Sequence, residues 1–432
     1  MAARRHSAAG LLAWALYDWA NSAFSTLIET FVFAAYFARS VAGNEAAGTA
    51  QWGNMLAVSG LVIGLGGPVL GAVADHRGRR KPWIAAFTLL SVTATALLWF
   101  VRPDPSWALP GLVLAGLGVV GMEYGFIFSN AMLPSLCPPD RLGRWSGWGW
   151  AVGYVGGLLC LVLGLYGLVA KDAWLALPRA DAEHVRATAF LAAAWFGLFS
   201  LPLFFFSADD PDTGLGFRDA VRAGVAQLRD SLRQVRDYKD IVRFLIARML
   251  YNDGLTTMFA FGGIYAAGSF GMEPEEILLY GIGLNVTAGL GAAAFAVLDD
   301  RVGAKKVIVW SLWGLIVPGT LMLVVQSKAL FWVFGLILGL FVGPAQASSR
   351  TWLARMAPEE VRNQMFGLFA LSGKITAFIG PLLVGWLTLA SGSQRVGLSS
   401  VILLFVVGLW LLRKVPGTEQ GFAKASGAGY KE

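Results

Sequence analysis

Several ionisable and polar residues interrupt the apolar stretches of this sequence, where they could bind a charged solute or carry a proton. In the first stretch these are Asp18, Asn21, Ser25 and Glu29. Positions 18, 22, 25 and 29 have the spacing of one helical face. If this helix crosses a bilayer, each buried charge costs about 2.5–3.5 kcal/mol. We therefore expect the face to line a cavity; the alternative is hydrogen bonds that only hold helices together.

Other apolar stretches carry further polar candidates, which we expect to bind solute or couple its movement to an ion: Glu123, Asn130, Arg248, Asn252, Asp253 and Lys374. The combined set contains both acids and bases. A zwitterion with one carboxylate and one ammonium group would match such a cavity. Salt bridges that lock one conformation are the alternative, especially for Arg248 with Asp253, five residues apart on one helix. Among the acids, Glu29 and Glu123 are the best candidates to carry a coupling proton.

The composition identifies the elements that must position these side chains. The chain has 432 residues, of which 56% are hydrophobic and 14% charged, with a mean hydropathy of +0.61. These values do not fit a water-soluble surface. The apolar residues suffice for roughly twelve spans at about 20 residues each. An all-α integral membrane protein with twelve transmembrane helices follows.

The apolar runs fall into two sets of six, which predicts two bundles and four regions along the chain. These are a six-helix bundle over 1–207, a linker over 208–240, a second six-helix bundle over 241–414 and a tail over 415–432. The linker carries Arg218, Arg222 and Arg229 among several aspartates and is expected to be solvated and partly helical. One helix of the second bundle is predicted near 363–390, where Gly367, Gly373 and Gly380-Pro381 allow close helix contact and bending.

Basic residues predict the orientation of these helices. With the N-terminus inside, 25 of the 34 Lys and Arg residues fall on the cytoplasmic side, 7 outside and 2 within spans. This asymmetry favours cytoplasmic termini and a cytoplasmic linker in a cell (inner) membrane. The excess of basic residues therefore gives no reason to expect nucleic acid as a partner. The first apolar run lacks a small-residue cleavage site and is expected to be a mature helix.

An internal repeat relates the two sets. Leu16-Tyr17-Asp18 resembles Leu250-Tyr251-Asn252-Asp253, the segment after the second helix is echoed by 298–306, and Pro139-Asp140-Arg141 is echoed by Pro358-Glu359-Glu360. The three similarities occur in the same order and are separated by about half the chain. Parallel six-helix repeats place a substrate cavity at their interface near mid-membrane.

A glycine-rich basic segment follows the second helix, with Gly71, Asp75, Arg77, Gly78 and Arg79 at its key positions. It resembles the loop signature of the major facilitator superfamily, and the resemblance implies that superfamily's fold of two parallel six-helix repeats. A carboxylate at a helix end can pair with the positive N-terminus of a neighbouring helix. We expect these residues to control conformational state, together with their counterparts Asp300 and Arg301.

Other classes of function lack support in the sequence. Cys137 and Cys160 form no C-x-x-C motif, and the three histidines fall in loops or the terminus, so we expect no metal, no cofactor and no enzymatic activity. No phosphate-binding G-x-x-x-x-G-K-[ST] motif is present to indicate ATP as an energy source.

Four longer strings resemble the vacuole effluxer group of the major facilitator superfamily: Tyr17-Asp18-Trp19-Ala20-Asn21-Ser22-Ala23-Phe24, Leu250-Tyr251-Asn252-Asp253-Gly254, Asp299-Asp300-Arg301-Val302-Gly303, and residues 366–374 with Gly380-Pro381. Fungal members export neutral amino acids such as leucine from the vacuole. The resemblance places Asp18, Asn21, Asn252, Asp253 and Lys374 on the family's motif positions.

The leading hypothesis is a secondary active transporter that works by alternating access. It would move a small polar solute, an amino acid, with proton coupling, and act as a monomer in the bilayer. A multidrug or metabolite exporter is the first alternative, and a membrane scaffold that transports nothing is the second.

Overall fold

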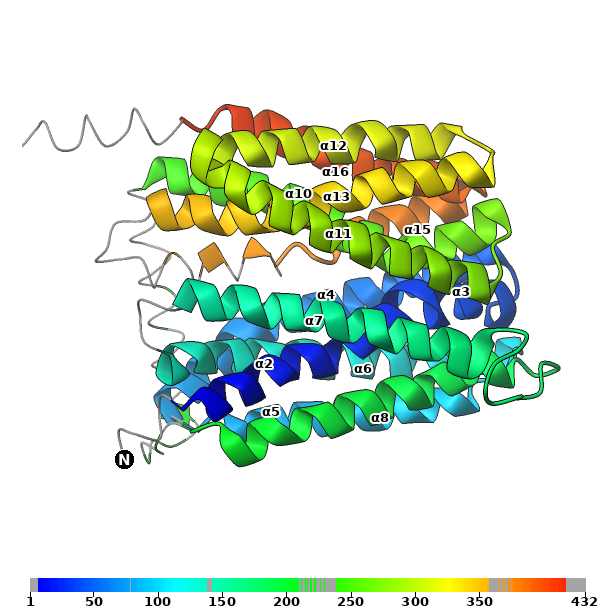
Figure 1. The fold of residues 1–432 in the computed structure, drawn as a ribbon, viewed down its shortest axis with the longest axis horizontal. Helices are drawn as coiled ribbons and strands as arrows, with labels where there is room; N and C mark the ends of the chain where they lie inside the picture. The colour runs from blue at the N-terminus through cyan, green and yellow to red at the C-terminus, as the bar shows by residue number, and fades with distance from the viewer. Residues whose placement is uncertain are drawn as a thin grey trace, which may run out of the picture.

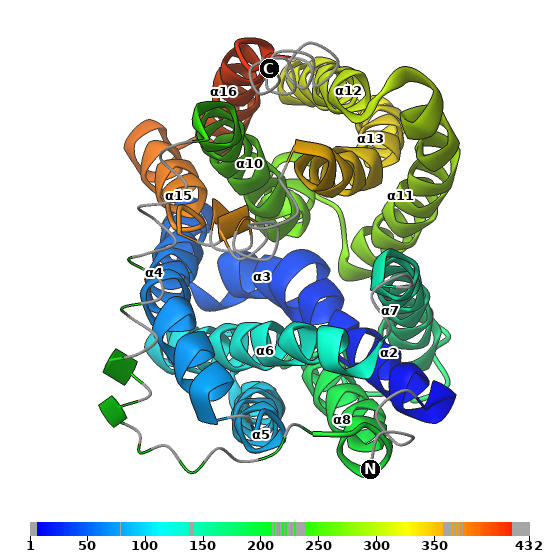
Figure 2. The same ribbon diagram turned by 90° about the vertical axis from the view of Figure 1, so that its left-hand side faces the viewer.

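A computed structural model describes residues 7–77, 79–137, 142–209, 238–356 and 375–416, with scattered positions between them. The helices form two groups of six spans, shown in Figures 1 and 2. The linker and the tail predicted at 208–240 and 415–432 lie largely outside the described residues, as do Gly78 and Lys374.

The first group begins with a composite helix and continues with five further spans. The first span contains α2 (Ala8–Ala23), the π-helix η1 (Phe24–Phe31), α3 (Phe33–Tyr36) and the π-helix η2 (Phe37–Val41). The other spans are α4 (Glu45–Arg77), α5 (Lys81–Leu97), α6 (Ala108–Leu136), α7 (Leu142–Gly164) and α8 (Glu183–Phe206). Short helices extend three of these: η3 (Leu98–Phe100), η4 (Pro105–Trp107) and η6 (Leu165–Val169).

The second group contains α10 (Lys239–Phe270), α11 (Pro274–Val302), α12 (Ala304–Val324), α13 (Lys328–Met356), α15 (Ile379–Ser391) and α16 (Gln394–Arg413). Within the described residues, seven helices of the two groups are both long and apolar enough to cross a bilayer. The outer faces of the bundle also expose large apolar side chains, among them Leu109 at 72% and Phe205 at 75%. Such exposure suits a surface that faces lipid.

Close contacts join the two groups near one end of the bundle. A side-chain carbon at Gly53 of α4 would lie 2.5 Å from the Pro381 carbonyl oxygen, and one at Gly263 of α10 would collide with the Thr30 carbonyl. Glycine at these positions therefore lets the backbones of the two groups approach closely. Figure 1 shows α7 and α11 diverging from this end toward the end where the N-terminus lies.

Polar contacts reinforce the same end. Gln394 at the start of α16 donates to the Thr49 hydroxyl of α4 at 3.1 Å, and both side chains are buried. Arg39 forms an ion pair with Glu273 at 3.4 Å across the two groups. The structure is thus a conformation closed at the end opposite the N-terminus.

The helix predicted near 363–390 is interrupted in its middle. Described residues up to Ser372 are helical, residues 373 and 375–378 form turns, and α15 begins at Ile379. Pro381 explains part of this break, because proline lacks a backbone N–H and is favoured in the first turn of a helix, where Pro381 lies in α15. The other part lies in contacts from α10, which are described with the site.

Candidate functional site

The first helix is rotated so that its acidic residue faces α7. The Tyr17 hydroxyl lies 2.7 Å from the Thr88 hydroxyl of α5, and the Trp14 indole donates to the Ser129 carbonyl of α6 at 2.7 Å. These two contacts fix the helix on one side. Asp18 then points toward α7, where a side-chain carbon at Gly149 would lie 2.6 Å from its Oδ2.

The predicted polar face of the first helix divides into two parts. Asp18 and Asn21 are buried, 6% and 8% exposed, whereas Ser25 and Glu29 are half-buried. The prediction assumed 3.6 residues per turn, but Phe24–Phe31 is a π-helix. A π-helical turn contains more residues, which shifts the later positions around the axis. The π-helix therefore alters how positions 25 and 29 lie around the helix axis relative to positions 18 and 22.

Arg248 and Asn252 of α10 bind the broken helix of the same group. Arg248 donates to the Phe369 carbonyl at 2.7 Å and to the Ser372 hydroxyl at 2.9 Å, and its guanidinium lies 3.5 Å from the centre of the Phe369 ring. Asn252 donates to the Gly373 carbonyl at 3.3 Å. Both side chains thus contact carbonyl oxygens near the break.

Asp253 binds the other side of the break. Its carboxylate accepts a hydrogen bond from the Gly380 N–H at 3.1 Å, and the side chain is 1% exposed. The second oxygen, Oδ1, has no hydrogen-bond donor among the described residues, although the Thr257 hydroxyl lies close enough to interact with the carboxyl group. The ion pair between Arg248 and Asp253, the alternative to a binding role, is absent from these two described residues, because each side chain binds the broken helix instead.

Arg350 of α13 is a charged residue that the sequence analysis missed. Its charge interacts with Asp18 of the first group and with Arg248 of the second. Arg350 lies at the C-terminal end of the apolar run that predicts this span, and α13 continues beyond it to Met356. The i, i+4 spacing of Gln346 and Arg350 could have indicated a polar face.

The remaining predicted binding residues lie on α6 and in the broken helix. Glu123 is half-buried and Asn130, seven residues later, is exposed. Lys374 lies outside the described residues. The charges of Asp18 and Arg248 thus both interact with that of Arg350.

The predicted conformational loop is described in part. Gly71, Asp75 and Arg77 lie on the last turns of α4 and Asp300 on α11, with side chains outside the description. Arg79 and Arg301 are exposed.

An acidic residue that the sequence analysis did not single out binds this loop. Asp209 accepts hydrogen bonds from the Arg80 and Lys81 backbone N–H groups at 2.9 and 3.2 Å. A carboxylate at the N-terminus of α5 also complements the helix dipole.

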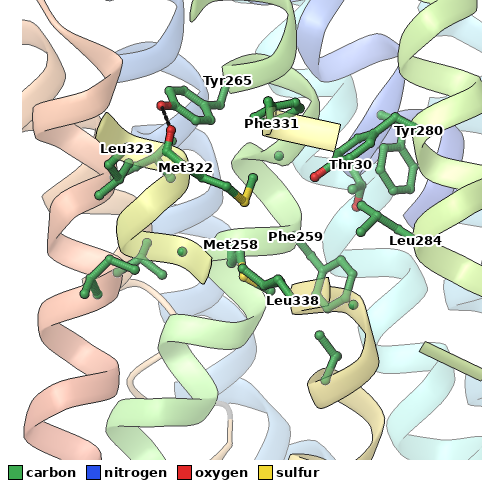
Figure 3. Close-up of a pocket in the computed structure, with 18 residues that line it drawn as sticks. Thr30, Met258, Phe259, Tyr265, Tyr280, Leu284, Met322, Leu323, Phe331 and Leu338 are labelled. Atoms are coloured by element: carbon green, nitrogen blue, oxygen red, sulfur yellow. Dashed lines mark hydrogen bonds between the residues drawn. The ribbon is translucent and has the colours of Figure 1, made fainter. Parts of the chain in front are cut away.

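An apolar cavity lies within the second group, as Figure 3 shows. Its lining includes Met258, Phe259, Met322 and Leu338, and the Tyr265 hydroxyl beside it donates to the Met322 carbonyl at 3.0 Å. Thr30 and Phe31 of the first group complete one side. None of the predicted charged residues lines this cavity, so it is separate from the Asp18 and Arg350 contact.

The described residues contain no cluster of three or more His, Cys, Asp and Glu side chains that could hold a metal ion. Cys137 and Cys160 are both buried and form no disulfide with each other. The polar groups of the bundle are instead carboxylates, guanidinium groups, amides and hydroxyls, which suit the binding of a charged or polar solute.

Comparison with known proteins gives the family. The profile described as "Vacuole effluxer Atg22 like" matches residues 40–425. The MFS-type transporter YxiO of Bacillus subtilis (strain 168) is 26% identical over 412 residues, which cover 93% of this chain and 94% of the relative. Autophagy-related protein 22 of Saccharomyces cerevisiae (strain ATCC 204508 / S288c) is 22% identical over 403 residues, covering 82% and 74% of the two chains.

Solved structures show the same fold. A D-xylose-proton symporter superposes with a TM-score of 0.68 at 15% identity, covering 96% of this chain and 98% of that one. A bacterial homolog of the human lysosomal transporter Spinster, inward-facing and occupied, superposes with a TM-score of 0.66 at 14% identity, covering 96% of each chain. The chain therefore belongs to the vacuole effluxer Atg22-like family and is a multi-pass membrane transporter with the major facilitator superfamily fold.

Proposed function

We propose that this protein is a secondary active transporter that moves an amino acid by alternating access and couples its movement to a proton. The observation that carries the proposal is the electrostatic interaction between charges of the two groups of helices. Asp18 on α2 interacts with Arg350 on α13, which also interacts with Arg248 on α10. A zwitterionic solute can bind an acidic group of one half and a basic group of the other, and so link their movements.

The family and the arrangement of the halves support this function. The matching profile describes effluxers, and one structural neighbour is a proton symporter. Contacts through Gly53 and Gly263 close one end of the bundle. We propose that this end faces outward in a cell membrane, with the termini cytoplasmic, and that the monomer is the working unit. The present conformation would then be open toward the cytoplasm.

Neutralising the proposed proton carriers is expected to uncouple transport. Glu29→Gln and Glu123→Gln should each abolish accumulation driven by a pH gradient, because an amide does not exchange the proton that a carboxylate carries. Exchange of labelled for unlabelled solute across proteoliposomes should continue, since that process needs no net proton movement. Both rates can be measured in one preparation.

The matched control is Glu275→Gln, which changes a half-buried glutamate in the first turn of α11. It should keep normal accumulation. Unchanged accumulation in both the Glu29→Gln and Glu123→Gln proteins would contradict their assignment as proton carriers.

A ligand screen tests the substrate class. A solute that binds only the folded protein raises the free energy of unfolding by mass action, by about 2.7 kcal/mol when its concentration is 100 times the dissociation constant. The melting temperature rises with it. Neutral amino acids should therefore stabilise the purified protein by several degrees, whereas sugars and organic acids should not. A shift that disappears in the Arg350→Gln protein would support binding at the proposed site.

The apolar cavity favours a second candidate, an exporter of lipophilic compounds. Its lining contains methionines and aromatic residues, which suit varied apolar ligands. Stabilisation by lipophilic cations alone would favour this exporter, and the absence of stabilisation by every class of solute would favour a scaffold that transports nothing.

A further inference from the structure

The break in the eleventh span is held by side chains of α10 that complement both of its ends. Arg248 donates to the Phe369 carbonyl and the Ser372 hydroxyl, where the described helical residues end. Asp253 accepts from the Gly380 N–H in the first turn of α15. A cation suits the C-terminal end of a helix and an anion suits its N-terminal start. Two residues of α10, five positions apart, therefore supply the charge that each end requires.

The break also lies against the other group of helices. A side-chain carbon at Gly60 of α4 would lie 3.1 Å from the Phe378 nitrogen and 3.3 Å from the Ala377 carbonyl carbon. Farther along, α15 packs on α4 at Gly53 and Gly385. Any movement of α15 is therefore transmitted to the contact that closes the bundle.

One carboxylate oxygen of Asp253 is available to bind a proton. Its Oδ2 is used by Gly380, while Oδ1 is buried and has no donor among the described residues. The Thr257 hydroxyl, itself buried, lies nearby and could accept a hydrogen bond from a protonated Oδ1. A buried carboxylate with an unsatisfied oxygen is costly, and binding a proton relieves part of that cost.

In the part of the chain that the structure describes, the elements packed around this carboxylate carry ionisable arginines on α10 and α13. Arg248 is on the same helix, five residues earlier, and Arg350 of α13 interacts with Arg248. The α15 sequence Ile379–Ser391 contains no ionisable residue, and Leu404 and Phe405 of α16 pack beside Gly254. Lys374 lies outside the described residues.

We propose that Arg248 and Asp253 are positioning residues that keep the eleventh span broken at residues 373 and 375–378, and that protonation of Asp253 loosens the start of α15. Protonation removes the negative charge that complements the helix N-terminus and weakens the acceptor of the Gly380 N–H. The contact between α15 and α4 then becomes easier to open. The inference rests on the proposed function only for its place in a transport cycle, since the loosening itself requires no solute.

Hydrogen exchange in the purified protein without solute tests this proposal. We expect amides of peptides covering 379–391 to exchange about fivefold faster at low pH, after correction for intrinsic exchange, because a lost helix cap costs about 1 kcal/mol. Asp253→Asn retains an acceptor for Gly380 but cannot titrate, so the pH step should vanish. Asp253→Leu removes the acceptor and should exchange fast at every pH.

Asp18→Asn is the matched control, because it neutralises a buried aspartate of the other group, and it should keep the pH step in α15. A wild-type protein without a pH step, or an Asp253→Asn protein that retains it, would overturn the proposal. If the pH step follows Asp253 but no solute is transported, the positioning role stands and the proposed function fails.

Discussion

Replacing Gly263 by alanine is expected to reduce transport by about 10- to 100-fold. The added methyl group would collide with the Thr30 carbonyl and lie 2.8 Å from the Phe31 carbonyl oxygen. Both are backbone atoms of the first group, so a change of rotamer does not relieve the clash. Overpacking of this kind costs about 1–3 kcal/mol, and one factor of ten in rate corresponds to about 1.4 kcal/mol. Flux in proteoliposomes measures the loss.

The neighbouring residue provides the control. A side-chain carbon at Gly262 meets no atom within 4 Å, so Gly262→Ala should transport normally. The two variants gain the same helix propensity and differ only in contact between the groups. A cysteine introduced at Ala50, which is buried at the closed end, should be labelled faster by a thiol reagent in the Gly263→Ala background, because the clash weakens the closed end. Equal flux and equal labelling in the two variants would contradict the account of this contact.

Arg350→Gln is expected to lower transport at least about tenfold, because it leaves the buried Asp18 carboxylate without an opposite charge from the other group. Asp18→Asn should have a similar effect, because it leaves the Arg350 guanidinium without the opposite charge of Asp18. In the double variant neither charge remains, so the combined loss should be smaller than the sum of the two. A double-mutant cycle on flux measures this coupling, which amounts to about 0.5–3 kcal/mol for interacting neighbours.

Arg243→Gln is a suitable control for this cycle. Arg243 forms an exposed ion pair with Asp240 at 3.2 Å on α10, and exposed pairs contribute little. Its neutralisation should leave flux unchanged. Strictly additive losses for Asp18→Asn and Arg350→Gln would show that their charges do not act together in transport.

The fold was predictable because each span carries its own signal. Apolar runs of about 20 residues bounded by charge or proline mark most spans, and the motif containing Tyr17 recurs around Tyr251. In the structure both tyrosines bind hydroxyl groups of other helices, Thr88 and Ser349, each at 2.7 Å. A repeated motif with a repeated packing role is what the sequence comparison detected.

The details of the site depended on contacts that sequence spacing does not contain. The π-helix at Phe24–Phe31 changes how residues are arranged around the helix axis, and no residue type in this segment predicts a π-helix. Pro381 could have suggested a helix boundary, but the hydrogen bond from Gly380 to Asp253 joins residues 127 positions apart. Arg350 was missed because its helix is longer than the apolar run within it.

Uptake of labelled neutral amino acids into proteoliposomes under an imposed pH gradient tests the central claim most directly. The account predicts accumulation above the equilibrium level, whose extent follows the gradient and which a protonophore abolishes. Accumulation of lipophilic cations in place of amino acids, or amino-acid flux that ignores the gradient, would contradict the proposal of a proton-coupled amino-acid transporter.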